Sequence, residues 1–242
     1  MNVVVPMAGR GSRFADRGVE TPKPLIEVHG RPMIAWALDG IRDILASASR
    51  VIFVALREHD GRFALASMLP ALGGPNSQVV FIDAVTEGQL CTVLAADEHL
   101  DMGSDLLVAS CDTYVVSPLA RDIAARTPDC HGIISVADLP GDRWSFARTD
   151  DAGRVVEVAE KVRISNHAST GLYYFSSARE LVDIAHGMIA RQEKTRGEYY
   201  VIPVYEKLIA QGHRVDISVA SEMHDMGTPE AMHAFTTRAA RA

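Results

Sequence analysis

Two glycines and two basic residues near the N-terminus have the types and spacing of a phosphate-binding loop. Gly9 and Gly11 let backbone amides turn toward a ligand without interference from a Cβ atom, and such amide concavities bind phosphate. Arg13 adds a forked, permanently charged donor that suits phosphate oxygens. Lys23 lies between two prolines, so its backbone is stiff and its ammonium is held over the loop at little entropic cost. A loop with two fixed cations predicts a polyanionic ligand.

This loop must be positioned by the strand before it and by the elements after it. Residues 3–5 are valines, a run short enough for a buried parallel strand, which Pro6 closes. Further strands are expected at 51–56, 79–82 and 106–108, and helices over 33–45 and from Glu87-Gly88 onward. Strands that alternate with helices predict an α/β fold, a Rossmann-like open sheet, mostly parallel or mixed, flanked by helices. Ligands of such sheets lie beyond the carboxyl ends of the strands.

Three motifs together resemble the signature of the sugar-phosphate nucleotidylyltransferases, also called nucleotide-sugar pyrophosphorylases, and within that family the short capsule-type branch. They are Gly9-x-Gly11-Ser12-Arg13, Pro22-Lys23-Pro24-Leu25 and Val28-x-Gly30-x-Pro32-Met33. The chain departs from the usual motif at Ala8, where most members have a second glycine.

This resemblance implies a GT-A-like nucleotidyltransferase fold and a role in nucleotide-sugar biosynthesis for capsule or other polysaccharide. It implies that a nucleoside triphosphate is joined to a phosphorylated acceptor, in the first place a sugar 1-phosphate, with release of pyrophosphate. The residues that it assigns to the nucleotide in this loop are Ala8, Gly9, Gly11, Ser12, Arg13 and Lys23.

Asp112 directly follows the strand expected at 106–108, at the edge of the sheet where ligands bind. By residue type alone, the sequence favours a helix-capping or turn carboxylate at this position. The resemblance implies that it coordinates Mg²⁺ together with Asp225, which precedes a Gly-Thr-Pro helix entry as in the family's Asp-x-Gly-Thr-Pro motif. A hard cation that bridges phosphate oxygens prefers carboxylate ligands and keeps several waters. The expected catalytic residues are therefore Arg13, Lys23, Asp112 and Asp225, with Mg²⁺ as the cofactor.

The second half of the chain is expected to bind the acceptor. Strand-like runs occur at 133–137, 145–147, 155–158 and 171–175, and helices are expected over 176–191, up to 209 and over 231–242. The resemblance implies that Glu160 and Lys161 contact the acceptor and that Gly171 and Glu198 lie near it, although Glu160 and Lys161 could also be a solvated ion pair. We expect one domain, residues 1–242, in which 1–115 mainly bind the nucleotide and 116–242 mainly bind the acceptor.

The segment that contains Asp83, Glu87 and Gly88 corresponds to the region in which members of the family hold the nucleobase. An ionised Asp83 only accepts hydrogen bonds, so it would favour a base with an amino donor, as cytosine has at N4, over uracil or thymine. Asp83 could instead end a strand and face water. We predict CTP as the donor, with UTP or dTTP as the alternative.

Composition restricts the partners. With 31 acidic against 24 basic residues, the net charge of −7 argues against broad nucleic-acid binding. No run reaches the ~18 apolar residues that a membrane span needs, so no membrane partner is expected and the cytoplasm is the default location. The three cysteines have no CxxC spacing and support neither a disulfide framework nor a zinc site. A homo-oligomer is left open.

Three other functions are weighed against this one. The first keeps the reaction but takes a non-sugar acceptor such as phosphocholine, a phospho-amide or a phosphonate. The second is a non-catalytic nucleotide-binding regulatory subunit, against which the four intact catalytic residues speak. The third is a glycosyltransferase with an Asp-x-Asp metal motif, which the chain lacks at its expected strand ends.

Overall fold

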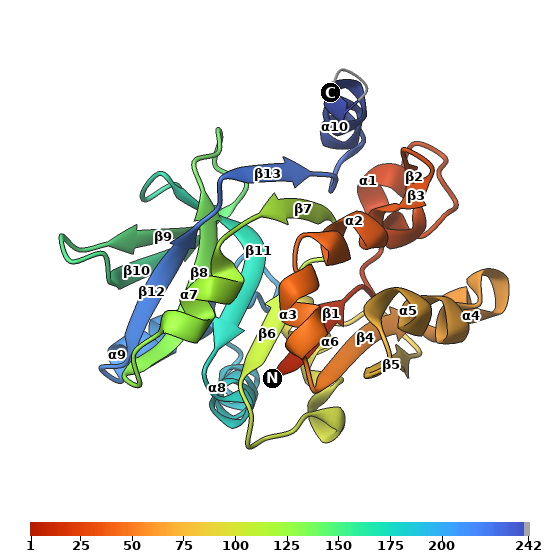
Figure 1. The fold of residues 1–242 in the computed structure, drawn as a ribbon. Coiled ribbons are helices and arrows are strands. Elements are labelled where there is room, and N and C mark those ends of the chain that lie inside the picture. The colour runs from red at the N-terminus through yellow and green to blue at the C-terminus, as the bar shows by residue number, and fades with distance from the viewer. Residues whose placement is uncertain (240–242) are drawn as a thin grey trace.

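The computed structural model describes residues 1–239, and a nine-stranded sheet forms its centre (Figure 1). One half of this sheet is parallel and contains, in spatial order, β5 (Ser77–Ile82), β4 (Arg50–Leu56), β1 (Asn2–Pro6) and β6 (Leu106–Ala109). The chain adds β4 and β5 on one side of β1 and then returns to add β6 on the other side. The carboxyl ends of β1 and β6 therefore form a topological switch point, where ligands of open α/β sheets bind.

The other half of the sheet is mixed. β11 (His167–Phe175) runs antiparallel to β6 and also pairs with β8 (Cys130–Ala137) and β9 (Ser145–Thr149). β10 (Val155–Glu160) extends the sheet beyond β9, and β12 (Arg214–Val219) pairs with β8 in parallel. The expected α/β fold with a mixed sheet is confirmed, and the strands of both halves of the chain join in this one sheet.

Helices cover both faces of the sheet. Side chains of α2 (Met33–Asp39), α3 (Arg42–Ser47), α5 (Leu65–Gly73) and α7 (Leu119–Ala125) pack on one face, and those of α6 (Gln89–Leu94), α8 (Ala178–Ala190) and α9 (Ile202–Ala210) on the other. Val3 and Val5 belong to the first of these cores and Val4 to the second, because side chains alternate along a strand. This burial on both faces explains why β1 is a continuous valine run. The short helix α4 (Arg57–Phe63) precedes α5.

The single helix expected over 33–45 is wrong, because two helices meet there at Gly40. A Cβ atom on Gly40 would lie 2.7 Å from the carbonyl oxygen of Val115, so the backbone of β7 (Thr113–Val116) passes directly over this turn. The following residue, Ile41, leaves helical geometry at φ −122°. The break therefore results from a close tertiary contact that helical periodicity does not reveal.

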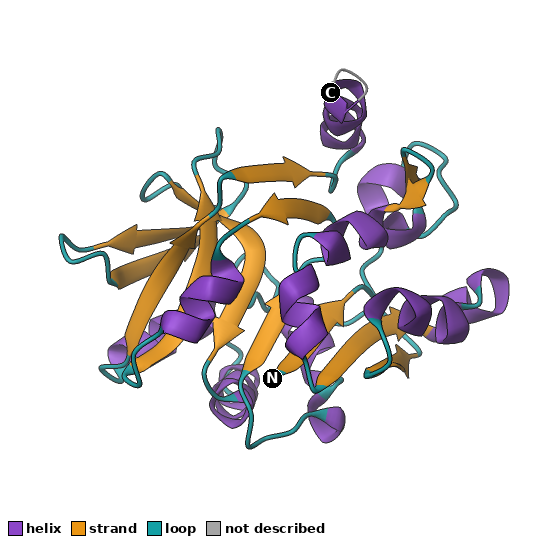
Figure 2. Cartoon of the chain, viewed as in Figure 1, coloured by secondary structure: helices purple, strands orange, loops and turns teal. Residues whose placement is uncertain are grey.

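Two small antiparallel sheets lie above the carboxyl ends of the parallel strands (Figure 2). β2 (Glu27–Val28) pairs with β3 (Arg31–Pro32), and β7 pairs with β13 (Glu222–Asp225). Near them lie α1 (Ser12–Ala15), a 3₁₀ turn (Lys23–Leu25) and α10 (Pro229–Ala239). Part of the helix expected over 231–242 thus lies in α10, and residues 240–242 lie outside the described chain.

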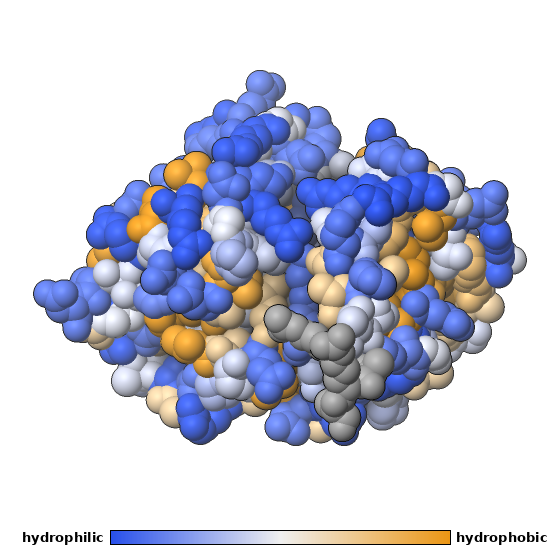
Figure 3. All heavy atoms as spheres, turned by 90° about the horizontal axis from the view of Figure 1, so that it is seen from above, coloured by the Kyte–Doolittle hydropathy of each residue, from blue (hydrophilic) through white to orange (hydrophobic). Residues whose placement is uncertain are grey.

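Hydrophilic side chains predominate on the face of the molecule that carries these small sheets (Figure 3). Within residues 1–239, no helix combines the length and the apolar composition that crossing a bilayer requires.

Candidate active site

The loops after β1 and β6 lie next to each other because these strands are parallel neighbours, with Val3 opposite Leu107 and Val4 opposite Val108. A cavity of about 260 Å³ opens beside them. Five of the predicted site residues line it, and they come from both halves of the chain: Arg13, Asp112, Glu160, Gly171 and Asp225. The cavity therefore lies where the switch point of the sheet predicts it.

The glycine loop after β1 is shaped to bring Lys23 close to it. Gly11 has the left-handed conformation (φ 59°) and comes immediately before α1, in which Ser12 is the first residue. A Cβ atom on Gly11 would lie 3.2 Å from the Cβ of Lys23. A larger residue would thus be strained and would push the lysine away. Ala8 is buried, whereas Gly9 is exposed.

Lys23 forms an ion pair with the first predicted metal ligand. Its Nζ atom lies 2.7 Å from Oδ2 of Asp112, and both side chains are mostly buried, with 24% and 21% of their surface exposed. Burial alone would lower the pKa of Lys23, but the charge of Asp112 and their hydrogen bond outweigh it and raise the pKa. Lys23 is therefore positively charged at neutral pH. Burial raises the pKa of the adjacent Cys111 to about 12, so this thiol is protonated.

The β7–β13 pair brings Asp112 and Asp225 together. Asp225 lies opposite Thr113 in the ladder, and the amide of Met226 donates to the carbonyl of Asp112 at 2.9 Å. A Cβ atom on Gly227 would lie 2.9 Å from Oδ2 of Asp112 and 3.0 Å from Oδ1 of Asp225, so only glycine leaves room for both carboxylates. Burial, and then the charge of Asp112, raise the pKa of Asp225. A cation bound between the two side chains would offset both effects and favour the ionised form of Asp225.

Arg143 is a second basic residue at this pair, after Lys23, and sequence reasoning missed it. Its Nη2 atom lies 2.6 Å from Oδ2 of Asp225, and its guanidinium lies 4.3 Å from the ring centre of Trp144. It comes from the loop between β8 and β9 and also lines the cavity. No spacing signal marks it, because its partner is 82 residues away in the chain. Arg143 lowers the pKa of Asp225 and so opposes the effect of burial.

The residues around Gly227 fit a magnesium ion. The two candidate ligands, Asp112 and Asp225, are carboxylates, and a hard cation such as Mg²⁺ prefers oxygen ligands. One or two carboxylates suffice for Mg²⁺, because waters and substrate phosphates complete its octahedral shell. Lys23 and Arg143 each hold one oxygen of this pair, at 2.7 and 2.6 Å. They therefore also limit how the carboxylates can turn toward an ion.

The opposite wall of the cavity contains Glu160, one of the two residues expected to contact the acceptor, while the other, Lys161, does not line the cavity. Glu160 is buried and accepts from the hydroxyl of Ser145, and burial raises its pKa. Lys161 lies 4.0 Å from Glu160, has a left-handed backbone (φ 54°) and donates to the hydroxyl of Tyr200. Glu160 is therefore a buried carboxyl group rather than one partner of a solvated surface pair.

Gly171 lines the same wall, while Glu198 does not. A Cβ atom on Gly171 would lie 2.3 Å from Oγ of Ser110, so β11 could not approach the end of β6 with a larger residue there. Glu198 is exposed and closes a turn by backbone hydrogen bonds with Thr195. The role of Glu198 at the acceptor stays a prediction.

The segment expected to hold the base lies beside the cavity, but Asp83, Glu87 and Gly88 do not line it. Asp83 is 82% exposed and accepts from Nε of Arg57 at 2.7 Å, while Glu87 lies 2.7 Å from Nζ of Lys194. Gly88 (φ 146°) is the N-cap residue before α6, and a Cβ atom there would lie 2.4 Å from the carbonyl oxygen of Tyr199. The next residue, Gln89, does line the cavity, which sequence reasoning did not anticipate.

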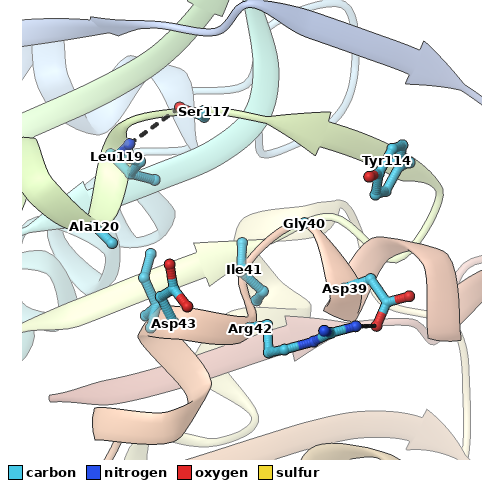
Figure 4. Close-up of a pocket in the computed structure, with 10 residues that line it drawn as sticks. Asp39, Gly40, Ile41, Arg42, Asp43, Tyr114, Ser117, Leu119 and Ala120 are labelled. Carbon is cyan, nitrogen blue, oxygen red and sulfur yellow. Dashed lines mark hydrogen bonds and ion pairs between the residues drawn. The ribbon is translucent and has the colours of Figure 1, made fainter.

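A second cavity, of about 280 Å³, lies between α2 and α3 on one side and β7 and α7 on the other (Figure 4). Its lining includes Asp39 and Arg42, which form an ion pair at 2.7 Å, and the ring of Tyr114. None of the predicted site residues lines it. The candidate active site is therefore the cavity at the switch point.

Comparison with known proteins defines the family. The model of the MobA-like NTP transferase domain matches residues 3–170, which is more than half of the chain. The chain therefore belongs to this family, and the expected nucleotidyltransferase class and fold are confirmed.

Individual relatives agree with this assignment. UTP–glucose-1-phosphate uridylyltransferase AglF of Haloferax volcanii is 25% identical over 242 residues, which cover 95% of this chain and 93% of that protein. The bifunctional protein GlmU of Thermotoga maritima is 26% identical over 83% of this chain, which spans only 43% of that protein. The 2-aminoethylphosphonate cytidylyltransferase of Lancefieldella rimae is 26% identical and covers 76% of this chain and 72% of that protein.

A solved structure shows the same fold along almost the whole chain. The nucleoside-diphosphate-sugar pyrophosphorylase from Vibrio cholerae RC9 superimposes with a TM-score of 0.83 at 27% sequence identity. The match covers 97% of this chain and 99% of that one.

Proposed function

We propose that this protein joins a nucleoside monophosphate group, taken from a nucleoside triphosphate, to a phosphorylated acceptor. An oxygen of the acceptor phosphate attacks the α-phosphorus, the bond from that phosphorus to the bridging β-phosphate oxygen breaks, and pyrophosphate leaves. The observation that carries this proposal is the meeting of Lys23, Asp112 and Asp225 beside Arg13 at the switch point of the sheet. Family membership supports the same reaction class.

The side chains supply charge and position rather than a nucleophile. A phosphomonoester is already anionic at neutral pH, so the reaction needs no general base to create the attacking oxygen. Arg13 lines the cavity and would bind the departing pyrophosphate, and Lys23 would bind the reacting phosphates after it exchanges Asp112 for them. Mg²⁺, held by Asp112 and Asp225, would neutralise charge on the phosphate oxygens. Arg143 holds Asp225 in place for this role.

The buried wall opposite the loop would bind the acceptor. Glu160 lies close to Ser145 and Tyr173 and can accept hydrogen bonds from sugar hydroxyls, which supports a sugar 1-phosphate. Lys161 would bind the acceptor phosphate. In this proposal residues 1–115 mainly serve the nucleotide and 116–242 the acceptor, and the protein acts in the cytoplasm, where nucleoside triphosphates are supplied.

A second acceptor class is supported by the same wall. The buried carboxyl group of Glu160, with the aromatic ring of Tyr173 lining the same cavity, also suits an ammonium group, through charge and cation–π attraction. The relative named as a 2-aminoethylphosphonate cytidylyltransferase is named for an acceptor of that kind. An aminoalkyl phosphonate or phosphocholine is therefore the alternative acceptor.

The proposal is tested by pyrophosphate release from the purified chain with Mg²⁺. The four ribonucleoside triphosphates and dTTP are each combined with glucose 1-phosphate, N-acetylglucosamine 1-phosphate, phosphocholine and 2-aminoethylphosphonate. We expect release that depends on one acceptor class and one base, with CTP as the predicted donor. Release that occurs equally without any acceptor would instead indicate triphosphate hydrolysis and would contradict the proposal.

A further inference from the structure

Two histidines and a glutamate converge on the surface away from the cavity. Nδ1 of His131 lies 3.0 Å from Oε2 of Glu180, and Nε2 of His213 lies 3.1 Å from Oε1 of the same carboxylate. The two imidazole rings are stacked, with centres 3.7 Å apart and planes at 18°. In the described part of the chain, this is the one group of three such side chains whose ligand atoms all lie within 4.8 Å of one another.

This cluster is separate from the proposed active site. Gly132, the neighbour of His131, lies opposite Phe175 in β11, and Phe175 lies opposite Leu106, the first residue of β6. The cavity lies beyond Ala109, at the other end of β6. The reaction proposed above uses none of the three side chains.

We propose that His131, Glu180 and His213 bind a divalent transition-metal ion, with Zn²⁺ as the reference ion. Two imidazole nitrogens and one carboxylate oxygen form a donor set that zinc uses, with a water in the fourth position. Ligands about 2.0–2.2 Å from a tetrahedral zinc ion are about 3.4 Å apart. The two histidines contact different oxygens of Glu180, at 3.0 and 3.1 Å, and the candidate ligand atoms all lie within 4.8 Å of one another. Mg²⁺ and Ca²⁺ prefer oxygen and would not compete at this site.

The backbones that carry the three ligands are already fixed. His131 lies in β8, and its carbonyl accepts from the amide of Ser176 at 2.9 Å. Glu180 lies in the first turn of α8, where its own amide donates to Oγ of the capping Ser177 at 3.2 Å. The amide of His213 donates to the carbonyl of Leu208 at 3.0 Å, just after α9. Metal binding would therefore turn the two stacked imidazole rings toward the ion while the backbone stays in place.

The helix that leads to His213 is anchored to the strand that carries His131. A Cβ atom on Gly132 would lie 2.5 Å from the ring of Tyr205, so the bare glycine lets α9 pack directly on β8. The hydroxyl of Tyr205 also donates to the carbonyl of Tyr174 at 2.8 Å. A metal here would link β8, α8 and the turn before β12, so its expected effect is on stability rather than on turnover.

The test uses the whole 242-residue chain, stripped of bound metal and then held in excess Mg²⁺ to fill the proposed site at Asp112 and Asp225. We expect calorimetry with ZnCl₂ to give one saturable site per chain. At one hundred times the dissociation constant, Tm should rise by roughly 5–10 °C. Cobalt(II) should give the visible absorption of a tetrahedral site, while further Mg²⁺ or Ca²⁺ should change nothing.

Variants assign the ligands. His131→Ala, Glu180→Gln and His213→Gln should each lose the zinc-dependent rise in Tm, and Glu180→Gln keeps the backbone cap from Ser177. The matched control is His186→Ala. His186 also pairs with a carboxylate, that of Asp97 at 3.3 Å, but it does not belong to the group of three possible metal ligands found in the described residues. The proposal would be overturned if the wild-type protein in Mg²⁺ shows no saturable zinc binding. It would also be overturned if zinc raises the Tm of His131→Ala and His213→Gln as much as it raises that of the wild type. Neither result would bear on nucleotidyl transfer, which is assayed separately.

Discussion

Nζ of Lys23 donates to Oδ2 of Asp112 at 2.7 Å, although the two residues are 89 positions apart in the chain. This contact joins the proline-framed segment after β1 to the end of β6. It brings the proposed phosphate-binding cation to within one hydrogen bond of the proposed metal ligand.

Replacement of the loop cations should affect the chemical step. We expect Lys23→Ala and Arg13→Ala each to lower kcat by about 10²–10³, because each removes a charge that stabilises the transferring or departing phosphates. Steady-state kinetics with varied nucleotide measures this. Lys207→Ala, which removes a surface lysine paired with Glu193 at 2.7 Å, is the control and should leave kcat unchanged. Wild-type kinetics for Lys23→Ala would remove that residue from the site.

The two aspartates should act as one metal site. Asp112→Asn and Asp225→Asn should each abolish most turnover and raise the Mg²⁺ concentration needed for half-maximal rate, because each loses a ligand charge. The rate is measured as a function of Mg²⁺, with Asp183→Asn on the exposed side of α8 as the control. If either variant keeps a near wild-type rate at saturating Mg²⁺, its role as a ligand is wrong.

Arg143 should set the pH range of metal binding. The pKa of Asp225 is raised by burial and by Asp112, and Arg143 lowers it. Mg²⁺ needs the ionised carboxylate, so activity at limiting Mg²⁺ is present above the pKa of Asp225 and lost as the pH falls through it. In a plot of the rate at limiting Mg²⁺ against pH, Arg143→Ala should therefore move the acidic limb to higher pH.

Two further variants sharpen this test. Arg143→Lys keeps a positive charge and should move the limb less than Arg143→Ala. Arg148→Ala removes an exposed arginine paired with Glu157 at 2.7 Å and should move nothing. A limb that stays in place in Arg143→Ala, or that moves to lower pH, would exclude this role of Arg143.

The acceptor wall should respond selectively to Glu160 and Lys161. Glu160→Gln and Lys161→Ala should raise KM for the acceptor by about tenfold or more, with a smaller effect on the nucleotide, because each removes a charged hydrogen bond. Glu157→Gln is a matched control on the same strand, since Glu157 is exposed. A change confined to the KM of the nucleotide would show that the assignment of these residues to the acceptor is wrong.

Base preference tests Asp83. If Asp83 accepts a hydrogen bond from cytosine N4, its ion pair with Arg57 must break when the nucleotide binds. Asp83→Ala should then reduce the ratio of CTP to UTP turnover. Glu58→Ala, which removes a neighbouring exposed acid, should leave this ratio unchanged. A clear preference for UTP or dTTP that persists in Asp83→Ala would contradict both the assignment of CTP as the donor and the role of Asp83 in recognising the base.

The sequence predicted the parts of the fold that depend on local patterns. The valines of β1 are buried on both faces, and Thr228 caps α10 by accepting from the amide of Ala231 at 3.1 Å, with Pro229 as the first helical residue. Both features follow from side chains close together in the chain.

The features that the sequence did not reveal depend on contacts between distant segments. β13 has no strand signal of its own, because Glu222-Met223-His224-Asp225 becomes a strand only by pairing with β7. Arg143 lies in a loop, and only the tertiary structure brings it into contact with its partner, Asp225. The resemblance to a family supplied the link between Asp112 and Asp225 that residue spacing could not.

The central claim is tested most directly by ³¹P NMR of one reaction mixture that contains the purified chain, Mg²⁺, the best donor and the best acceptor. The account predicts that the acceptor signal is replaced by two coupled signals of a new diphosphate linkage, together with an equal amount of pyrophosphate, and that Asp112→Asn gives neither. Inorganic phosphate as the product, an unchanged acceptor signal or full conversion by Asp112→Asn would contradict it.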